Sequence, residues 1–251
     1  MHNLADVLDK LGKTQEAESL RNIYLARRLS IMALKRPRMA LRVGVTGHRK
    51  LDVTYALRAR VRDVLQMLQA ATAEILVVAR SFYAEGPPLF RAVSSLAEGA
   101  DRLFAEEALS LGFELDCPLP FSQAEYEKDF PTRESVEEFR GLLSRATGRV
   151  LELDGPTRAE ERSGAYESVG RSVLDRSEML VAIWDGEPAK GAGGTGHIVE
   201  IAQRKRTPIL WIHPKTGAVV LKLRGAETTL TGDVLRDQLE PIFNRIGIQR
   251  P

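Results

Sequence analysis

The chain has 251 residues, with 36 Lys and Arg against 34 Asp and Glu, and its 43% apolar and 28% charged residues are typical of a soluble globular protein. The net charge of +2 argues against a protein that mainly coats nucleic acid, and the apolar runs are too short to cross a bilayer. The N-terminus lacks the apolar core of a secretory signal, and the lone Cys117 excludes an intramolecular disulfide or a cysteine-based zinc site, so we expect a cytoplasmic protein.

Residues 1–36 predict a short helical hairpin that precedes the main domain. Leu4, Leu8 and Leu11 recur at helical spacing, and Gly12 is suited to close the first helix. A helical hairpin of this size leaves an apolar face that further protein must cover.

Positive charge is concentrated near the N-terminus. The first 42 residues carry nine Lys and Arg and four Asp and Glu, so the rest of the chain carries 27 and 30, a net charge of −3. No carboxylate occurs between Glu18 and Asp52. This stretch is either a solvated basic linker or a contact surface for nucleic acid, an acidic partner or ligand phosphates.

Residues 37–251 predict one α/β domain with a Rossmann-like, mostly parallel sheet flanked by helices. Short apolar runs alternate with longer amphipathic stretches, which is typical of βαβ units. The expected strands are Leu41–Thr46, Ile75–Ala79, Leu89–Ser94, Glu114–Pro118, Val150–Leu153, Met179–Trp184, Ile209–Ile212 and Val219–Leu223. The expected helices are Val53–Ala71, Gly99–Leu111, Ser122–Phe130, Val136–Ala146, Arg162–Asp175, His197–Lys205 and Leu235–Ile246.

The first expected strand ends in a turn with polar and basic side chains. In an open parallel sheet, ligands bind outside the carboxyl ends of the strands. Gly47 lets the backbone approach a ligand closely, and the planar guanidinium of Arg49 is suited to clamp a phosphate. A solvated Arg49 after a common Thr-Gly strand end is the alternative. The candidate ligand-binding residues of this turn are Thr46, Gly47, His48 and Arg49.

A second strand end carries two hydroxyl groups and leads into a helix that opens near Gly99. Free amides at a helix N-terminus form an anion site. Asp101 in the first turn is equally suited to cap this helix and to interact with its dipole. The candidate ligand-binding residues are Ser94, Ser95, Glu98 and Gly99.

A glycine-rich loop follows the strand that ends at Trp184 and precedes the helix expected at His197. This order predicts a phosphate-binding loop, although it lacks the sequences of a Walker A loop and of a dinucleotide fold. A flexible loop, with Glu200 serving the helix dipole, is the alternative. The candidate ligand-binding residues are Asp185, Gly193, Gly194, Thr195, Gly196 and Glu200.

A fourth strand end, Cys117–Phe121, leads into another expected helix. Ser122 and Glu125 have the spacing of a capping box, which is a sufficient structural explanation for both. The ring of Phe121 or Tyr126 is a candidate for stacking on a base.

Together these segments resemble the superfamily of LOG (Lonely guy) phosphoribohydrolases, the DNA-processing protein DprA and SLOG ligand-sensing domains. The glycines and the glutamate of the LOG motif Pro-Gly-Gly-x-Gly-Thr-x-x-Glu match Gly193, Gly194, Gly196 and Glu200. Residues 94–101 resemble the DprA segment Ser-Gly-x-Ala-x-Gly-Ile-Asp. Residues 3–20 look like a tetratricopeptide repeat.

The resemblance implies a Rossmann-like domain that binds a nucleotide or an NAD-derived ligand as a sensor or regulatory domain, in the setting of bacterial defence signalling. One alternative is a LOG-like hydrolase of the N-glycosidic bond, with Glu200 and Arg171 as the catalytic pair. The other is DprA-like DNA binding.

The sequence and the resemblance also indicate which cofactors and partners to expect. We expect no cofactor and no metal. The expected partners are a nucleotide-derived small molecule, a second copy of the chain in a homo-oligomer, and an effector or repeat protein that contacts residues 1–36. Because the residues after Arg42 are net negative, we do not expect nucleic acid as a partner. Because the apolar runs are too short to cross a bilayer, we do not expect a membrane either.

Overall fold

The computed structural model describes residues 2–34, 36–158, 161–188, 191, 193–223 and 225–244. The chain forms two units, one of Met1–Met39 with Leu76–Pro87 and the other of Ala40–Ile75 with Pro88–Pro251. The predicted domains 1–36 and 37–251 differ from these units mainly in residues 76–87. These residues join the N-terminal unit through backbone contacts, including the amide of Ala84 on the carbonyl oxygen of Pro37 at 3.0 Å.

The N-terminal unit contains the expected helical hairpin, formed by α1 (His2–Lys10) and α2 (Thr14–Leu34). Gly12 has a φ of +75° between the two helices, a conformation that glycine adopts without steric cost. Ala5 and Ala17 are buried, because small side chains allow the helices to pack closely. The origin of the hairpin in a tetratricopeptide repeat stays a prediction.

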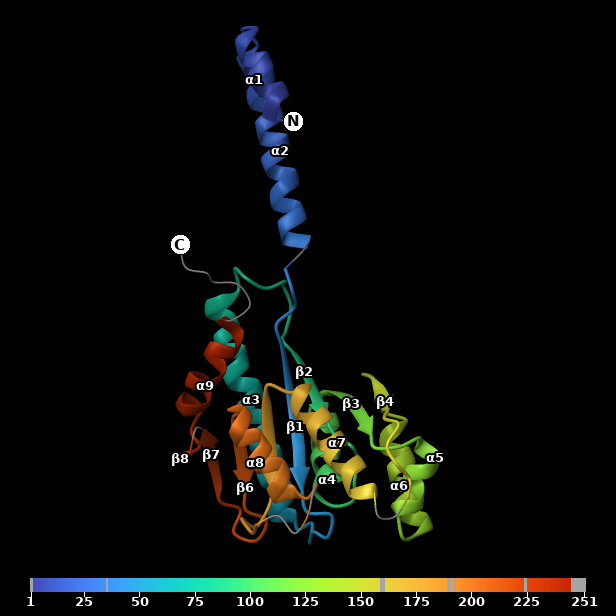
Figure 1. Cartoon of the computed structure of the whole chain (residues 1–251). Helices are drawn as coiled ribbons and strands as arrows, with labels where there is room; N and C mark the ends of the chain where they lie inside the picture. Colours follow the sequence, from blue (N-terminus) through green and yellow to red (C-terminus); the bar gives the residue numbers. More distant parts are fainter. Residues whose placement is uncertain are drawn as a thin grey trace. The chain divides into compact units, whose positions relative to one another are not determined.

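The larger unit is built on an eight-stranded sheet with the order β4-β3-β2-β1-β5-β6-β7-β8 (Figure 1). The strands from β4 to β6 are parallel, and β7 and β8 add an antiparallel edge. The predicted fold class, a Rossmann-like and mostly parallel α/β sheet, is therefore confirmed. The strands are β1 (Ala40–Gly47), β2 (Leu89–Val93), β3 (Glu114–Leu119), β4 (Val150–Glu152), β5 (Met179–Ile183), β6 (Ile209–Ile212), β7 (Val219–Leu223) and β8 (Ala226–Thr229).

Helices cover both faces of this sheet (Figure 1). On one face α7 packs beside α8, and on the other α3 is joined to α4 by ion pairs from Arg58 and Arg62 to Glu107. The helices of the larger unit are α3 (Tyr55–Ala79), α4 (Ala100–Ser110), α5 (Gln123–Tyr126), the 3-10 turn η1 (Glu127–Asp129), α6 (Arg133–Leu143), α7 (Arg162–Asp175), α8 (Thr195–Lys205) and α9 (Gly232–Asn244).

The core lies between the sheet and the helices on its two faces. All five residues of β5 are buried, as expected for a strand that is covered on both faces. The side of the core under α7 and α8 includes Val173, Leu180, Ile198 and Ile209. Burial of these apolar side chains fixes both helices against the sheet, and so it positions their ends at the sheet edge.

The strand expected at Ile75–Ala79 is wrong, because this segment forms the last turns of α3. Its run of Ile, Leu and Val favours a strand by composition, and periodicity over so few residues does not separate the two structures. Ile75 continues the buried face of the helix, while Val77 and Val78 are exposed.

Two further local predictions also need correction. The helix expected at Ser122–Phe130 is divided into α5 and η1, and the hydroxyl of Ser122 makes no capping hydrogen bond. Glu125 pairs instead with Lys128 and Arg162, which removes the carboxylate from the capping box. The strand β8 was not expected, because all four of its residues are exposed and carry no apolar alternation.

Candidate functional site

A cleft of about 410 Å³ opens at the carboxyl ends of the parallel strands, between the loops that follow β1 and β5. These two strands are neighbours in the sheet, although β2, β3 and β4 lie between them in sequence. The direction of the strand order therefore reverses here, and such a switch point is where doubly wound sheets bind ligands. The volume is within the range of small-molecule sites.

The cleft brings together residues from three of the predicted segments. Its lining includes Thr46 and Gly47 at the end of β1 and His48 and Arg49 directly after it. It also includes Ser95 after β2, and Asp185, Gly193, Gly194, Thr195 and Gly196 after β5. The aromatic part of the lining comes from Tyr126, Tyr166 and Trp184. A shared edge for these turns follows from the parallel arrangement of their strands.

The glycines of the first two turns pack the strand ends tightly. A Cβ atom on Gly47 would lie 2.3 Å from the Cβ of Ala100, and a Cβ atom on Gly99 would lie 2.4 Å from the carbonyl oxygens of His48 and Arg49. Gly99 also has a φ of +78°. Both glycines therefore hold the turn after β1 against the start of α4, and Gly99 does not itself line the cleft.

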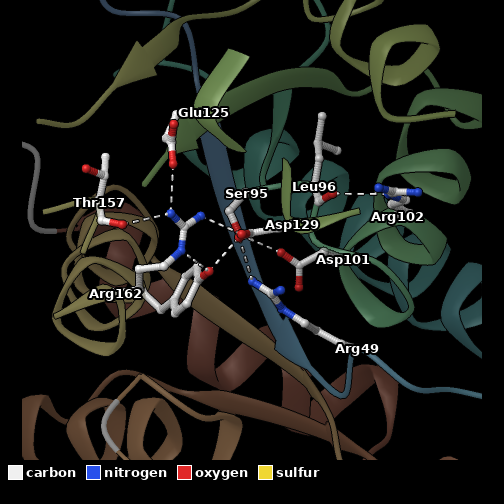
Figure 2. A network of polar contacts seen from close by, with 10 residues as sticks. Arg49, Ser95, Leu96, Asp101, Arg102, Glu125, Asp129, Thr157 and Arg162 are labelled. Carbon is white, nitrogen blue, oxygen red and sulfur yellow. Dashed lines mark hydrogen bonds and ion pairs between the residues drawn. The ribbon is translucent and has the colours of Figure 1, made fainter. Parts of the chain in front are cut away.

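Arg49 is the cation of the cleft that is best placed for an anionic ligand. Its guanidinium lies 4.8 Å from the centre of the Tyr166 ring, and its nearest ion-pair partner is Asp129 Oδ2 at 4.0 Å (Figure 2). Burial opposes the charge of Arg49, but the neighbouring Tyr126, Tyr166, Asp129 and Asp101 outweigh it and raise its pKa. Among the described residues, no acceptor within hydrogen-bond distance occupies this guanidinium.

Tyr166 and Asp129 are held in place by Arg162. The Tyr166 hydroxyl donates to Asp129 Oδ2. Arg162 pairs with Asp129 and with Glu125 (Figure 2). The guanidinium of Arg162 also lies 4.2 Å from the centre of the Phe121 ring. The guanidinium donors of Arg162 therefore bind protein groups, whereas those of Arg49 are available to a ligand.

The segment after β2 is organised mainly by its own hydrogen bonds. Ser94 is buried, and its hydroxyl accepts from the amide of Leu96 and donates to the carbonyl oxygen of Asp101. Ser95 donates to Asp101 Oδ2 at 2.8 Å, and Glu98 accepts from the hydroxyl of Ser135. Ser95 and Asp101 line the cleft, while Ser94 and Glu98 do not.

Asp101 provides a test of this buried arrangement. Burial raises the pKa of Asp101 from 3.8 to about 6, against the opposing effects of Ser95 and Arg49. A carboxyl group whose pKa is higher in the folded chain stabilises the fold most below pH ~4, and this contribution is lost as the pH rises through ~6. We expect Asp101→Asn to remove about 3 kcal/mol of this pH dependence from the free energy of unfolding. Denaturant titrations at several pH values measure it, and the same slope in both proteins would contradict the assignment.

The glycine-rich loop leads directly into the N-terminus of α8. This helix begins at Thr195, two residues earlier than expected, and Gly194 precedes it with extended backbone. Since the first amides of a helix have no partners within it, those of α8 are available to an anion in the cleft. Gly193 has a φ of +79° and donates its amide to His197 Nδ1 at 3.1 Å. Residues 189, 190 and 192 of the loop lie outside the described residues.

His48 and Asp185 join the loops after β1 and β5. His48 Nε2 lies 3.0 Å from Asp185 Oδ1. Although partial burial opposes it, the amide of Glu187 and the imidazole of His48 lower the pKa of Asp185. The pair thus closes one side of the cleft and places an ionised carboxylate there.

Glu200 and Arg171 lie outside the cleft lining. Glu200 is exposed on α8 and lies 3.7 Å from Arg204, and Arg171 is exposed on α7 and pairs with Glu167 at 2.7 Å. Because α8 starts at Thr195, Glu200 belongs to its second turn and does not line the cleft beside the loop that it was expected to serve. The structure does not bring these two residues together.

Sequence reasoning missed the aromatic, acidic and basic side chains behind Arg49, namely Tyr166, Asp129 and Arg162. The available signal was weak: Arg162, Tyr166 and Gly170 are spaced by four residues and therefore share one face of α7. Nothing in the sequence indicated that this face meets the turn after β1.

Comparisons with known proteins give similarity in fold. No family model and no curated protein matches the chain. Similar solved structures include DNA processing protein A from Streptococcus pneumoniae, with 15% identity and a TM-score of 0.44 over 85% of this chain and 58% of that chain. Another is DNA processing protein A from Helicobacter pylori, with 15% identity and a TM-score of 0.41 over 85% of this chain and 80% of that chain. The present chain thus spans 58% of the length of the first of these proteins.

We expected that nucleic acid is not a partner, and this exclusion is wrong. The Helicobacter pylori protein, which is similar in fold, has a single-stranded DNA binding mode. Our expectation rested on net charge, whereas single strands are bound by local cations and by aromatic rings on which bases stack. Arg49 and the rings of Tyr166 and Trp184 are local groups of this kind.

Neither a membrane-spanning helix nor a metal-binding cluster is found among the described residues. No helix among them has the length and apolar character needed to span a membrane. No group of three or more His, Cys, Asp or Glu side chains among them is arranged to hold a metal ion. The fold and the cleft therefore define a doubly wound α/β protein with a candidate ligand site at its switch point.

Proposed function

We propose that this chain binds a nucleotide unit, phosphate and base together, in the cleft at the switch point. The observation that carries the proposal is the convergence of two anion-binding features on one cleft. Arg49 lines it from the turn after β1, and the first amides of α8 line it beside Gly194 and Thr195. The rings of Tyr166 and Trp184 supply the apolar surface that a base needs.

Single-stranded DNA is the first ligand to test. In DNA the nucleotide unit would be one member of a strand that enters and leaves the cleft. With Arg49 as the fixed cation of the lining, the logarithm of the affinity should fall with the logarithm of the salt concentration with a slope of only about −0.7 to −1.4, which corresponds to one or two phosphates.

A free nucleotide is the second candidate ligand, and the size of the cleft favours it, since about 410 Å³ suits one small molecule. With this ligand the chain would act as a sensor, the role that the resemblance to SLOG domains implies. Hydrolysis of the ligand is not part of the proposal, because Glu200 and Arg171 do not line the cleft.

The experiment is a titration of the full chain with a fluorescent single-stranded oligonucleotide, in competition with the common nucleoside 5′-monophosphates and their nucleosides. We expect a nucleotide or the oligonucleotide to bind, and the nucleosides to bind at least about tenfold more weakly, because they lack the group that Arg49 contacts. Displacement of the oligonucleotide by a mononucleotide would place both in one site. No binding of any of them would refute the proposal.

A further inference from the structure

Carboxylates outnumber permanent cations among the described residues that line the cleft. Among the described residues that line it, Arg49 is the one permanently charged cation, while Asp101, Asp185 and Glu187 are carboxylates. His48 Nε2 lies 3.0 Å from Asp185 Oδ1, so the imidazole already contacts a carboxylate of the cleft. Among the described residues of the lining, a ligand phosphate therefore meets more carboxylates than permanent cations.

Among the described residues, the cation behind the cleft is offset by carboxylates. Asp129 lies 4.0 Å from Arg49, and the nearby cation Arg162 is shared between Asp129 and Glu125. The dipole of α8 adds the equivalent of about half a positive charge at its N-terminus. Arg49 and the α8 amides thus provide for one phosphate charge, and no second arginine or lysine lines the cleft among the described residues.

We propose, on the basis of the nucleotide site proposed above, that the cleft selects a phosphodiester over a phosphomonoester or a polyphosphate. A diester carries one negative charge, which Arg49 and the α8 amides match. A monoester well above its second pKa of about 6 carries two charges, and a polyphosphate carries more. Each additional charge would lie in the cleft that Asp185 and Glu187 line, and repulsion between like charges opposes it.

Two kinds of ligand contain a phosphodiester and a base. In a single strand the phosphodiester links neighbouring nucleotides, and in a cyclic mononucleotide it is part of the ring. Both have one charge for each phosphate, and both leave a base free to reach Tyr166 and Trp184.

The test compares each common nucleoside 5′-monophosphate with its own methyl ester at mildly alkaline pH, by calorimetry on the full chain. The two ligands of each pair share a base, a sugar and a phosphate, and they differ by one methyl group and one charge. We expect the ester to bind about tenfold more tightly. The double variant Asp185→Asn, Glu187→Gln should reduce this preference to about threefold or less, because it removes two of the opposing charges. Glu200→Gln, an exposed carboxylate outside the cleft, should leave the preference unchanged.

The outcomes separate this inference from the proposed function. Equal or tighter binding of the monoester would overturn the inference and leave nucleotide binding intact. A preference for the ester that the double variant does not reduce would also overturn the inference, because the carboxylate charges would then not be the cause of the preference. Failure of both ligands, and also of a cyclic mononucleotide and an oligonucleotide, would overturn the nucleotide site itself. Whichever of the last two ligands competes with the methyl ester identifies the source of the diester.

Discussion

Replacing Arg49 with Ala is expected to weaken nucleotide binding about 10- to 100-fold, because a charge-assisted hydrogen bond contributes about 1.5–3 kcal/mol. Arg49 lines the cleft, stacks on Tyr166 and has no closer ion-pair partner than Asp129 at 4.0 Å. Arg49→Lys keeps the charge but loses the planar fork, so we expect it to recover only part of the affinity. Titration of the three proteins with the same labelled oligonucleotide or mononucleotide measures the effect.

A matched control is available on α7. Arg171 is also an arginine of the larger unit, but it is exposed and pairs with Glu167 within its own helix. Arg171→Ala should leave binding unchanged. Arg49→Ala should alter the free energy of unfolding by only about 1 kcal/mol, since a cation–π contact of this kind is weak. Equal losses of affinity in both variants would show that general charge, rather than the position of Arg49, attracts the ligand.

The central part of the sheet was predictable because strands such as β5 are buried on both faces. Runs such as Met179–Ile183 are entirely apolar, and the intervening stretches have the helical period, so local patterns alone define the βαβ order. The convergence of the turns after β1 and β5 follows from the same order. Once strands are parallel, the residues after them meet at one edge of the sheet, whatever the details of packing.

Other parts depended on contacts between distant segments. The Tyr166–Asp129–Arg162 cluster joins α7 to η1, and no local pattern predicts how far apart these two elements lie. The predicted role of Glu200 depended on where α8 starts. Successive residues of an α-helix are about 100° apart around its axis. When the helix starts two residues earlier, the angle between its first residue and Glu200 therefore changes by about 200°, so Glu200 lies on a different side of the helix from the one that its spacing indicated.

Glycine motifs proved ambiguous for a physical reason. A glycine is required equally where a ligand approaches the backbone and where another segment of the chain does. Gly47 and Gly99 are of the second kind, because their missing Cβ atoms make room for Ala100 and for the carbonyl oxygens of residues 48 and 49. The sequence shows that space is needed at such positions, but only the structure shows what fills it.

The glycine-rich loop contains both kinds of glycine next to each other, and this allows a second prediction with a large effect. A Cβ atom on Gly194 would meet only Gly191 O at 3.3 Å, and the φ of Gly194 is −70°, which any residue adopts. A Cβ atom on Gly193 would lie 2.7 Å from the amide nitrogen of Glu167, at a φ of +79°. Gly194 is therefore open toward the cleft, whereas Gly193 is enclosed by α7.

We expect Gly194→Val to reduce nucleotide affinity about 100-fold or more while it changes the free energy of unfolding by only about 1 kcal/mol, because the new side chain fills the space in front of the α8 amides without straining the backbone. Gly193→Val should instead destabilise the fold by about 2–4 kcal/mol, from backbone strain and the contact with α7. Gly191→Val is the control, because a Cβ atom there meets nothing within 4 Å and Gly191 does not line the cleft. Denaturant unfolding and ligand titration of the three variants separate the two effects. Full affinity in Gly194→Val would show that the ligand phosphate does not lie at the start of α8, and the anion site would then have to be built on Arg49 alone.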